Sequence, residues 1–101
     1  MMVKGRKLQP LSRNDKEEII ERIAEEIYLF LDRKLGEENI DSLSLKVELE
    51  GDYYPIVVLE ADISINPFKL NDKELKDLLD EALEHGFNIA EKMIKERRKH
   101  G

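Results

Sequence analysis

Two runs of alternating apolar and polar residues, separated by a turn signal, constrain the fold of this chain most. In residues 43–50 (LSLKVELE) every second residue is apolar, and the same two-residue period returns in residues 57–65 (VVLEADISI). This period is typical of strands that have one buried and one solvated face. Gly51 and Asp52 lie between the runs and favour a turn, so the sequence predicts an antiparallel β-hairpin.

The apolar pattern also predicts how the two strands pair. A two-residue turn would place Leu43 opposite Glu60, whereas a three-residue loop at positions 51–53 would place Leu43 opposite Ala61. Because a shift by one residue inverts every side chain, we expect the longer loop, with a β-bulge within residues 53–55. The second strand is then expected to extend beyond the first by several residues.

Each flank of the hairpin has the features of a helix. The tetrapeptide NDKE occurs twice, and in each copy the asparagine, Asn14 or Asn71, is a favourable N-cap with a glutamate three residues later. Apolar residues follow at helical spacing, and Gly36 fits the end of the first helix. Gly86 lies in the middle of the second helix, where glycine costs roughly 1 kcal/mol relative to alanine. We therefore expect a close neighbour or a bend at Gly86.

These elements predict an α+β fold of order α-β-β-α, in which an antiparallel β-hairpin packs on two helices. A lone two-stranded hairpin is marginal in water, and the two helices can cover its apolar face. At 101 residues the chain is long enough for one domain. We expect a basic N-terminal arm at residues 1–13 and a single α+β domain at residues 14–101, with a basic end to its last helix.

Three apolar residues of the second strand region do not fit the buried face. Tyr54, Ile56 and Val58 fall on the face that also carries Glu60, where side chains should be solvated. An exposed apolar patch and an unpaired strand edge are both liabilities in a monomer. We therefore expect Tyr54, Ile56 and Val58 to form the interface of a homodimer, with the sheet extended to four strands.

The residues of this chain do not indicate catalysis. Cysteine is absent, the glycines are isolated, and no histidine is placed to activate a serine. Glu81 and His85 lie one helical turn apart and could share a metal ion or a proton, but the other histidine, His100, is at the end of the chain. We interpret Glu81 and His85 as a solvated pair. We expect no catalytic, metal or cofactor site, and no enzyme activity.

The net charge of −6 is distributed unevenly along the chain. Residues 14–91 contain 8 basic and 22 acidic residues, whereas both ends are basic. A site for RNA is an alternative function if the two ends converge in space. Against it, cations at the end of a helix also favour the helix dipole, and the acidic body repels a polyanion. The candidate residues for RNA are Lys4, Arg6, Lys7, Arg13, Lys95, Arg97, Arg98 and Lys99.

The overall composition is that of a soluble globular protein, with 40% charged and 41% hydrophobic residues. No apolar run is long enough to span a bilayer, and the sequence has no signal-peptide pattern. Abundant Glu, Lys and Ile with scarce Gln and no Cys favour a heat-adapted protein. We therefore expect a cytoplasmic protein from a thermophile, without contact to a membrane.

The run PIVVLEADISINPFKLNDKEL at residues 55–75, together with the chain length and element order, resembles a small archaeal family that is a domain of unknown function. The likeness spans most of residues 14–99. Members of that family are often encoded near the prefoldin β subunit and a subunit of a tRNA-modification complex. The resemblance implies an archaeal protein with a role near translation or protein folding, and it assigns no functional residues. We expect a non-enzymatic homodimeric protein-interaction module, with RNA association as the alternative.

Overall fold

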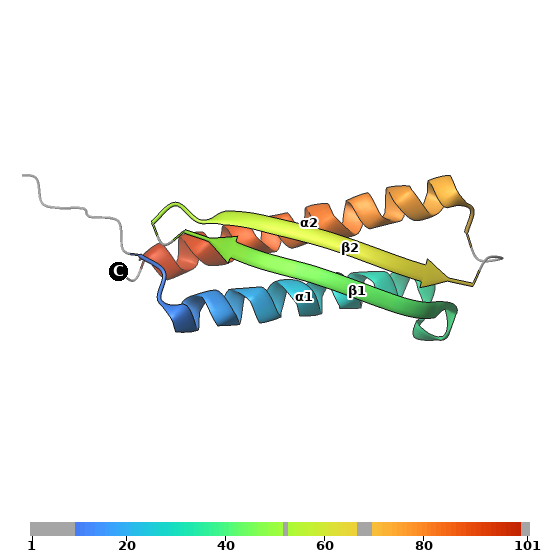
Figure 1. Ribbon diagram of the computed structural model, residues 1–101, viewed down its shortest axis with the longest axis horizontal. Helices are drawn as coiled ribbons and strands as arrows, with labels where there is room; N and C mark the ends of the chain where they lie inside the picture. Colours follow the sequence, from blue (N-terminus) through green and yellow to red (C-terminus); the bar gives the residue numbers. More distant parts are fainter. Residues whose placement is uncertain (1–9, 52, 67–69, 100–101) are drawn as a thin grey trace, which may run out of the picture.

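Two antiparallel helices lie side by side and carry a two-stranded antiparallel sheet on one face (Figure 1). The computed structural model describes residues 10–51, 53–66 and 70–99, without the side chains of residues 98 and 99. The elements are α1 (Arg13–Leu35), a short 3-10 helix (Glu37–Asn39), β1 (Ile40–Glu50), β2 (Ile56–Ile65) and α2 (Asp72–Lys99). The predicted α+β order α-β-β-α is confirmed.

Helix α1 begins two residues earlier than the sequence predicted. Its N-cap is Ser12, whose hydroxyl accepts a hydrogen bond from the Asp15 N–H at 3.0 Å, while the Asp15 carboxylate accepts one from the Ser12 N–H at 3.2 Å. The predicted N-cap, Asn14, therefore lies inside the first turn, and that prediction is wrong. Both tetrapeptides, SRND and NDKE, can form a capping box, and the earlier start lies directly after Leu11, which is buried in the core.

The other predicted helix ends are confirmed. The Asn71 side-chain oxygen accepts from the Glu74 N–H at 2.8 Å, and the Glu74 carboxylate accepts from the Asn71 N–H at 3.2 Å. This reciprocal capping box starts α2. At the end of α1, Gly36 has a φ of 87°, a left-handed conformation that favours glycine.

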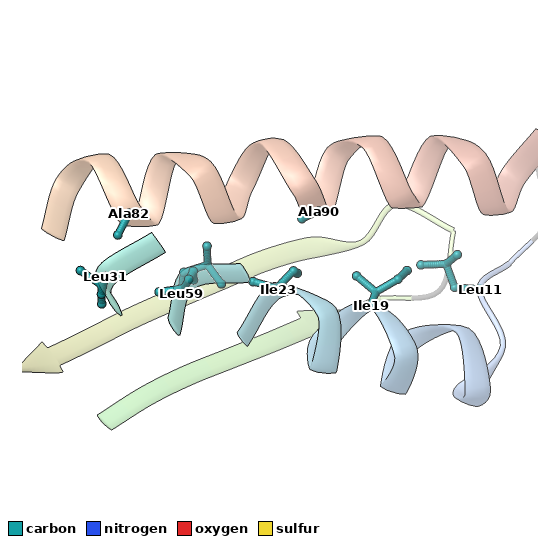
Figure 2. Packing of buried hydrophobic residues seen from close by; sticks show 8 residues of the cluster. Leu11, Ile19, Ile23, Leu31, Leu59, Ala82 and Ala90 are labelled. Carbon is teal, nitrogen blue, oxygen red and sulfur yellow. The ribbon is translucent and has the colours of Figure 1, made fainter. Parts of the chain in front are cut away.

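The core lies between the helix pair and the inner face of the sheet (Figure 2). Helix α2 contributes small residues to it, Ala82 and Ala90, and between them Gly86 lies against Ile27 and Leu59. The small side chains let α2 approach α1 closely, so the close neighbour expected at Gly86 is present. The largest contribution comes from α1, with buried residues at a regular four-residue spacing: Ile19, Ile23, Ile27, Leu31 and Leu35.

Each side chain of the hairpin lies on the predicted face of the sheet, but the cross-strand pairs differ from the predicted ones. Leu43 lies opposite Ile63 rather than Ala61, because β1 ends at Glu50 and residues 51–55 connect the strands instead of residues 51–53. The register differs from the expected one by two residues. An even shift keeps each side chain on its face, and it adds an apolar pair between Ile40 and Ile65 at the far end.

Two further expectations about the hairpin are wrong. The irregularity in the pairing lies between Ile40 and Ser42, not within residues 53–55, which belong to the loop. The strands also end together, since Glu50 pairs with Ile56 at one end and Ile40 with Ile65 at the other. Strand β2 therefore does not extend beyond β1. The longer loop accommodates Pro55, whose nitrogen cannot donate to a ladder, outside the paired region.

Candidate interaction surface

The connection between β1 and β2 exposes large apolar side chains at one end of the molecule, where α1 begins and α2 ends (Figure 1). Tyr54 is 76% exposed and Ile56 is 62% exposed, and Tyr53 is exposed beside them. Val58 is half-buried. We call Tyr53, Tyr54, Ile56 and Val58 the tip patch. It contains all three residues that the sequence indicated as a dimer interface.

The rest of the outer face of the hairpin is polar. Lys46 lies opposite Glu60, and its Nζ is 3.8 Å from the carboxylates of both Glu60 and Glu48. Farther from the tip, Ser44 lies opposite Asp62 on the same face, and both are exposed. The apolar part of the outer face is therefore confined to the tip end of β2.

A groove of about 480 Å³ adjoins the tip patch. Phe87 of α2 stands in it 44% exposed, and the ion pair between Lys95 Nζ and the Glu91 carboxylate, 3.1 Å apart, stands at its rim. Among the described residues, those lining the groove all come from the loop, β2 and α2. We call this feature the α2 groove, and it is lined by Tyr54, Pro55, Val57, Phe87, Glu91, Ile94 and Lys95.

The described parts of the two basic ends meet at the tip end of the molecule. Arg97 in the last turns of α2 binds Glu18 of α1, and its Nη1 is 3.9 Å from the Asp15 carboxylate. Arg13 at the start of α1 has its Nε 3.7 Å from Glu17. The start of α1 and the end of α2 are thus held together by ion pairs between the helices.

Ion pairs neutralise several of the basic residues that the sequence predicted as candidates for RNA binding. Arg13, Lys95 and Arg97 each lie next to a carboxylate of α1 or α2. Lys4, Arg6 and Lys7 lie outside the described residues, and so do the side chains of Arg98 and Lys99. Each RNA candidate whose side chain the structure describes is therefore paired with a carboxylate.

His85 pairs with a different helix from the one the sequence suggested. Its Nε2 is 3.3 Å from a carboxylate oxygen of Glu26 on α1, and its ring stacks on Phe30 with centroids 5.6 Å apart. Glu81 is exposed and lines a separate shallow depression with Lys34. The interpretation of Glu81 and His85 as a solvated pair is therefore wrong, because α1 lies close enough to offer both a carboxylate and an aromatic ring.

The contact with His85 perturbs Glu26. The hydrogen bond from His85, and then the one from Arg22 Nε at 3.0 Å, lower the pKa of the Glu26 carboxyl below its ordinary value, although partial burial acts in the opposite direction. Glu26 is thus held ionised between the two helices. Among the described residues, no group of three or more His, Cys, Asp or Glu side chains is placed to hold a metal ion.

Two parts of this surface were missed from the sequence. Phe87 was not predicted to be part of an interface, but its spacing of seven residues to Ile94 indicates a second apolar stripe on α2 that faces the groove. Tyr53 lies in the loop, as the sequence predicted, but it was not predicted to be part of the exposed apolar patch. That these two residues adjoin one surface depends on how the loop and α2 lie beside β2, which periodicity within one element does not reveal.

No family model matches the chain, and no curated protein matches it in sequence. A solution structure of the hypothetical protein mth677 from Methanothermobacter thermautotrophicus has the same fold, with a TM-score of 0.71. The two chains are 20% identical, and the likeness covers 95% of this chain and 99% of that one. The fold therefore occurs in an archaeal protein, in line with the archaeal resemblance of the sequence. Within the described residues, no helix is long and apolar enough to cross a membrane.

Proposed function

We propose that the protein is a non-enzymatic interaction module that acts as a homodimer and uses the tip patch for self-association. The observation that carries this proposal is the exposure of Tyr54 and Ile56, at 76% and 62%, on an outer face that is otherwise polar. Clustered large apolar side chains on a soluble domain mark interaction sites.

A second copy of this chain is the partner best suited to bury the tip patch. Both described helices pack on the inner face of the sheet, so neither can reach Ile56 or Val58. Burying one such side chain stabilises a complex by about 1.5–3 kcal/mol, and several at a twofold interface can offset the cost of association. An identical chain is present at every concentration, and a twofold contact uses each patch once.

The manner of contact follows from the spacing of the elements. A four-stranded sheet, as the sequence suggested, needs the two β2 edges about 4.8 Å apart, whereas packed helices need 8–10 Å between their axes. In that arrangement the two α2 helices, which lie under β2, would compete for the same space. We therefore favour a contact through side chains of the tip patch over pairing along the full strand edge.

Replacing Ile56 tests the proposal. Ile56→Asp places a charge within the tip patch and should yield a monomer, because an unpaired buried charge is strongly unfavourable. Ser64→Asp is the matched control, since Ser64 is exposed on the same face of β2 at its other end. Light scattering coupled to size exclusion should show a dimer for the control and a monomer for Ile56→Asp, with equal circular dichroism. A dimer in both variants would contradict the role of the tip patch.

RNA association is the second candidate, favoured by the meeting of α1's start and α2's end at one end of the molecule. Retention of a labelled single-stranded RNA, decreasing with salt and lost on removal of residues 98–101, would support it. This truncation keeps Arg97 and its contacts with α1, so the fold should remain. If neither the truncated chain nor the full chain retains the RNA, this candidate function is eliminated.

The resemblance to the archaeal family motivates a role near translation or protein folding. This role, and a cytoplasmic location, stay predictions. Purification of the tagged protein from its source cells, with the wild-type tip patch compared with Ile56→Asp, tests them. Co-purifying ribosomal or chaperone subunits that depend on Ile56 are the expected result, and a set that does not change with the variant would contradict it.

A further inference from the structure

The tip patch is small for a stable dimer. It consists of four side chains, whereas stable interfaces bury about 800 Å² on each partner and involve about 20–30 residues a side. A dimer that persists at micromolar concentration therefore needs further contact surface next to the patch. The α2 groove is continuous with the patch, because Tyr54 belongs to both.

We propose that the α2 groove is filled by a second copy of this chain, with the α2 helices of the two copies packed antiparallel about a twofold axis near residues 91–94. This proposal rests on the homodimer proposed above and extends it from β2 to α2. Phe87 of each copy would enter the groove of the other, between Tyr54 and Ile94. The site is incomplete in one copy, since Phe87 stands 44% exposed beside an unfilled hollow of about 480 Å³.

The spacing of the groove residues on α2 fits another helix as occupant. Phe87, Glu91 and Ile94 are four and three residues apart, which places them on one stripe of the helix. This stripe is distinct from the one formed by Ala82, Gly86 and Ala90, which packs against α1 and β2. Helix α2 therefore has two stripes suited to packing. The fold of one copy buries the stripe of Ala82, Gly86 and Ala90, and it leaves Phe87 and Glu91 of the other stripe exposed.

The charges at the rim of the groove on one copy are complementary to the same charges on a second copy. Each copy has one acidic residue, Glu91, and one basic residue, Lys95, which form an exposed pair one helical turn apart. About a twofold axis between them, antiparallel helices place Glu91 beside the partner's Lys95, and the symmetry repeats the contact. A heterologous partner would have to supply this pattern by chance, whereas a second copy always carries it.

Opposite charge variants test the contact between copies. Glu91→Lys makes both positions of the rim basic, and Lys95→Glu makes both acidic. Alone, each variant should dimerise about tenfold more weakly than the wild type, because two symmetry-related ion pairs become two repulsive contacts. Mixed in equal amounts, the two variants should form the mixed dimer with close to the affinity of the wild type. Mixing cannot restore an ion pair within one chain, so the mixed dimer reports the contact between chains.

Sedimentation velocity measures the affinities. Native mass spectrometry, with one variant uniformly labelled with a heavy nitrogen isotope, separates the mixed dimer from the two homodimers. The matched control is the exposed i,i+4 pair on α1, tested as Arg13→Glu and Glu17→Arg, which should dimerise like the wild type and mix statistically. A second comparison uses Phe87→Ser, expected to weaken the dimer at least tenfold. Tyr28→Ser, at a similarly exposed aromatic of α1 (40%), should leave it unchanged.

The outcomes separate this inference from the proposed dimer. If the wild type dimerises but the charge variants and Phe87→Ser dimerise equally well and mix statistically, the α2 groove is not covered by a second copy. The inference is then wrong, while the dimer through the tip patch stands. If the wild type is a monomer at all concentrations, both proposals are overturned. Preferential formation of the mixed dimer supports the inference.

Discussion

Gly86 of α2 lies directly against Ile27 of α1: a Cβ atom at Gly86 would come within 2.7 Å of Ile27 Cδ1. The same atom would be 3.0 Å from Leu59 Cδ1 of β2. Ile27 is fully buried, so its end cannot turn away into solvent. This contact sets the distance at which α2 packs on both α1 and the sheet.

Gly86→Ala should therefore destabilise the protein, although alanine favours a helix by about 1 kcal/mol over glycine. Overpacking in a closed core costs about 1–3 kcal/mol, which is at least as large as the gain in helix propensity. Urea denaturation measures the difference. Adding Ile27→Val, which removes Cδ1, should make the effect of Gly86→Ala smaller, and Asn88→Ala at an exposed site of α2 should be nearly neutral. A stabilised Gly86→Ala variant would show that the helices can move apart freely.

The N-cap of α1 can be tested with a control substitution in the same turn of the helix. Ser12→Ala and Asn71→Ala each remove an N-cap hydrogen bond and should lower the free energy of unfolding by about 0.5–2 kcal/mol. Asn14→Ala should have little effect, because Asn14 lies exposed inside the first turn. Thermal unfolding of the three variants decides between Ser12 and Asn14 as the cap. A greater loss from Asn14→Ala than from Ser12→Ala would contradict the structure.

Glu26 should contribute to the pH dependence of stability. Its pKa is lower in the folded state, through hydrogen bonds from His85 and Arg22, so its carboxylate stabilises the fold at pH values above the ordinary range for a carboxyl. This contribution is lost as the pH falls through the lowered pKa. Glu26→Gln should therefore lose stability at pH 7 and lose less than the wild type on acidification.

Denaturation curves at pH 7 and at pH 3 measure this linkage. Glu25→Gln, at an exposed neighbouring position on α1, is the control and should keep the acid sensitivity of the wild type. If Glu26→Gln and Glu25→Gln respond to acid in the same way, the contact between Glu26 and His85 does not act on stability.

Capping motifs and hydrophobic periodicity predicted the order of the helices and strands. The errors in strand register and in the N-cap of α1 have physical causes. Alternation with a period of two determines which face a residue lies on, but it cannot distinguish registers that differ by two residues, so Leu43 was paired with the wrong residue. Overlapping capping motifs at Ser12 and Asn14 are equivalent in sequence. Both were resolved by contacts distant in the chain, namely the burial of Leu11 and the added pair of Ile40 with Ile65.

The surface was harder to predict for a related reason. Ile56 and Val58 were found from the sequence because they violate the pattern of their own strand. The spacing of Phe87 and Ile94 indicates a second apolar stripe on α2. No pattern within α2 shows which loop lies beside that stripe, or that Glu26 of α1 contacts His85. The groove on this flank of α2 exists because Tyr54 and Pro55 of the loop lie beside the helix, which is a property of the fold and not of the α2 sequence.

The most direct test of the central claim is the molar mass of the wild-type protein in solution, measured by light scattering over a dilution series. One chain has a mass of 11.8 kDa. We predict a mass that approaches twice this value at high concentration and falls toward it on dilution, with Ile56→Asp at the single-chain mass throughout. A wild-type mass that stays at 11.8 kDa at every concentration would contradict the account.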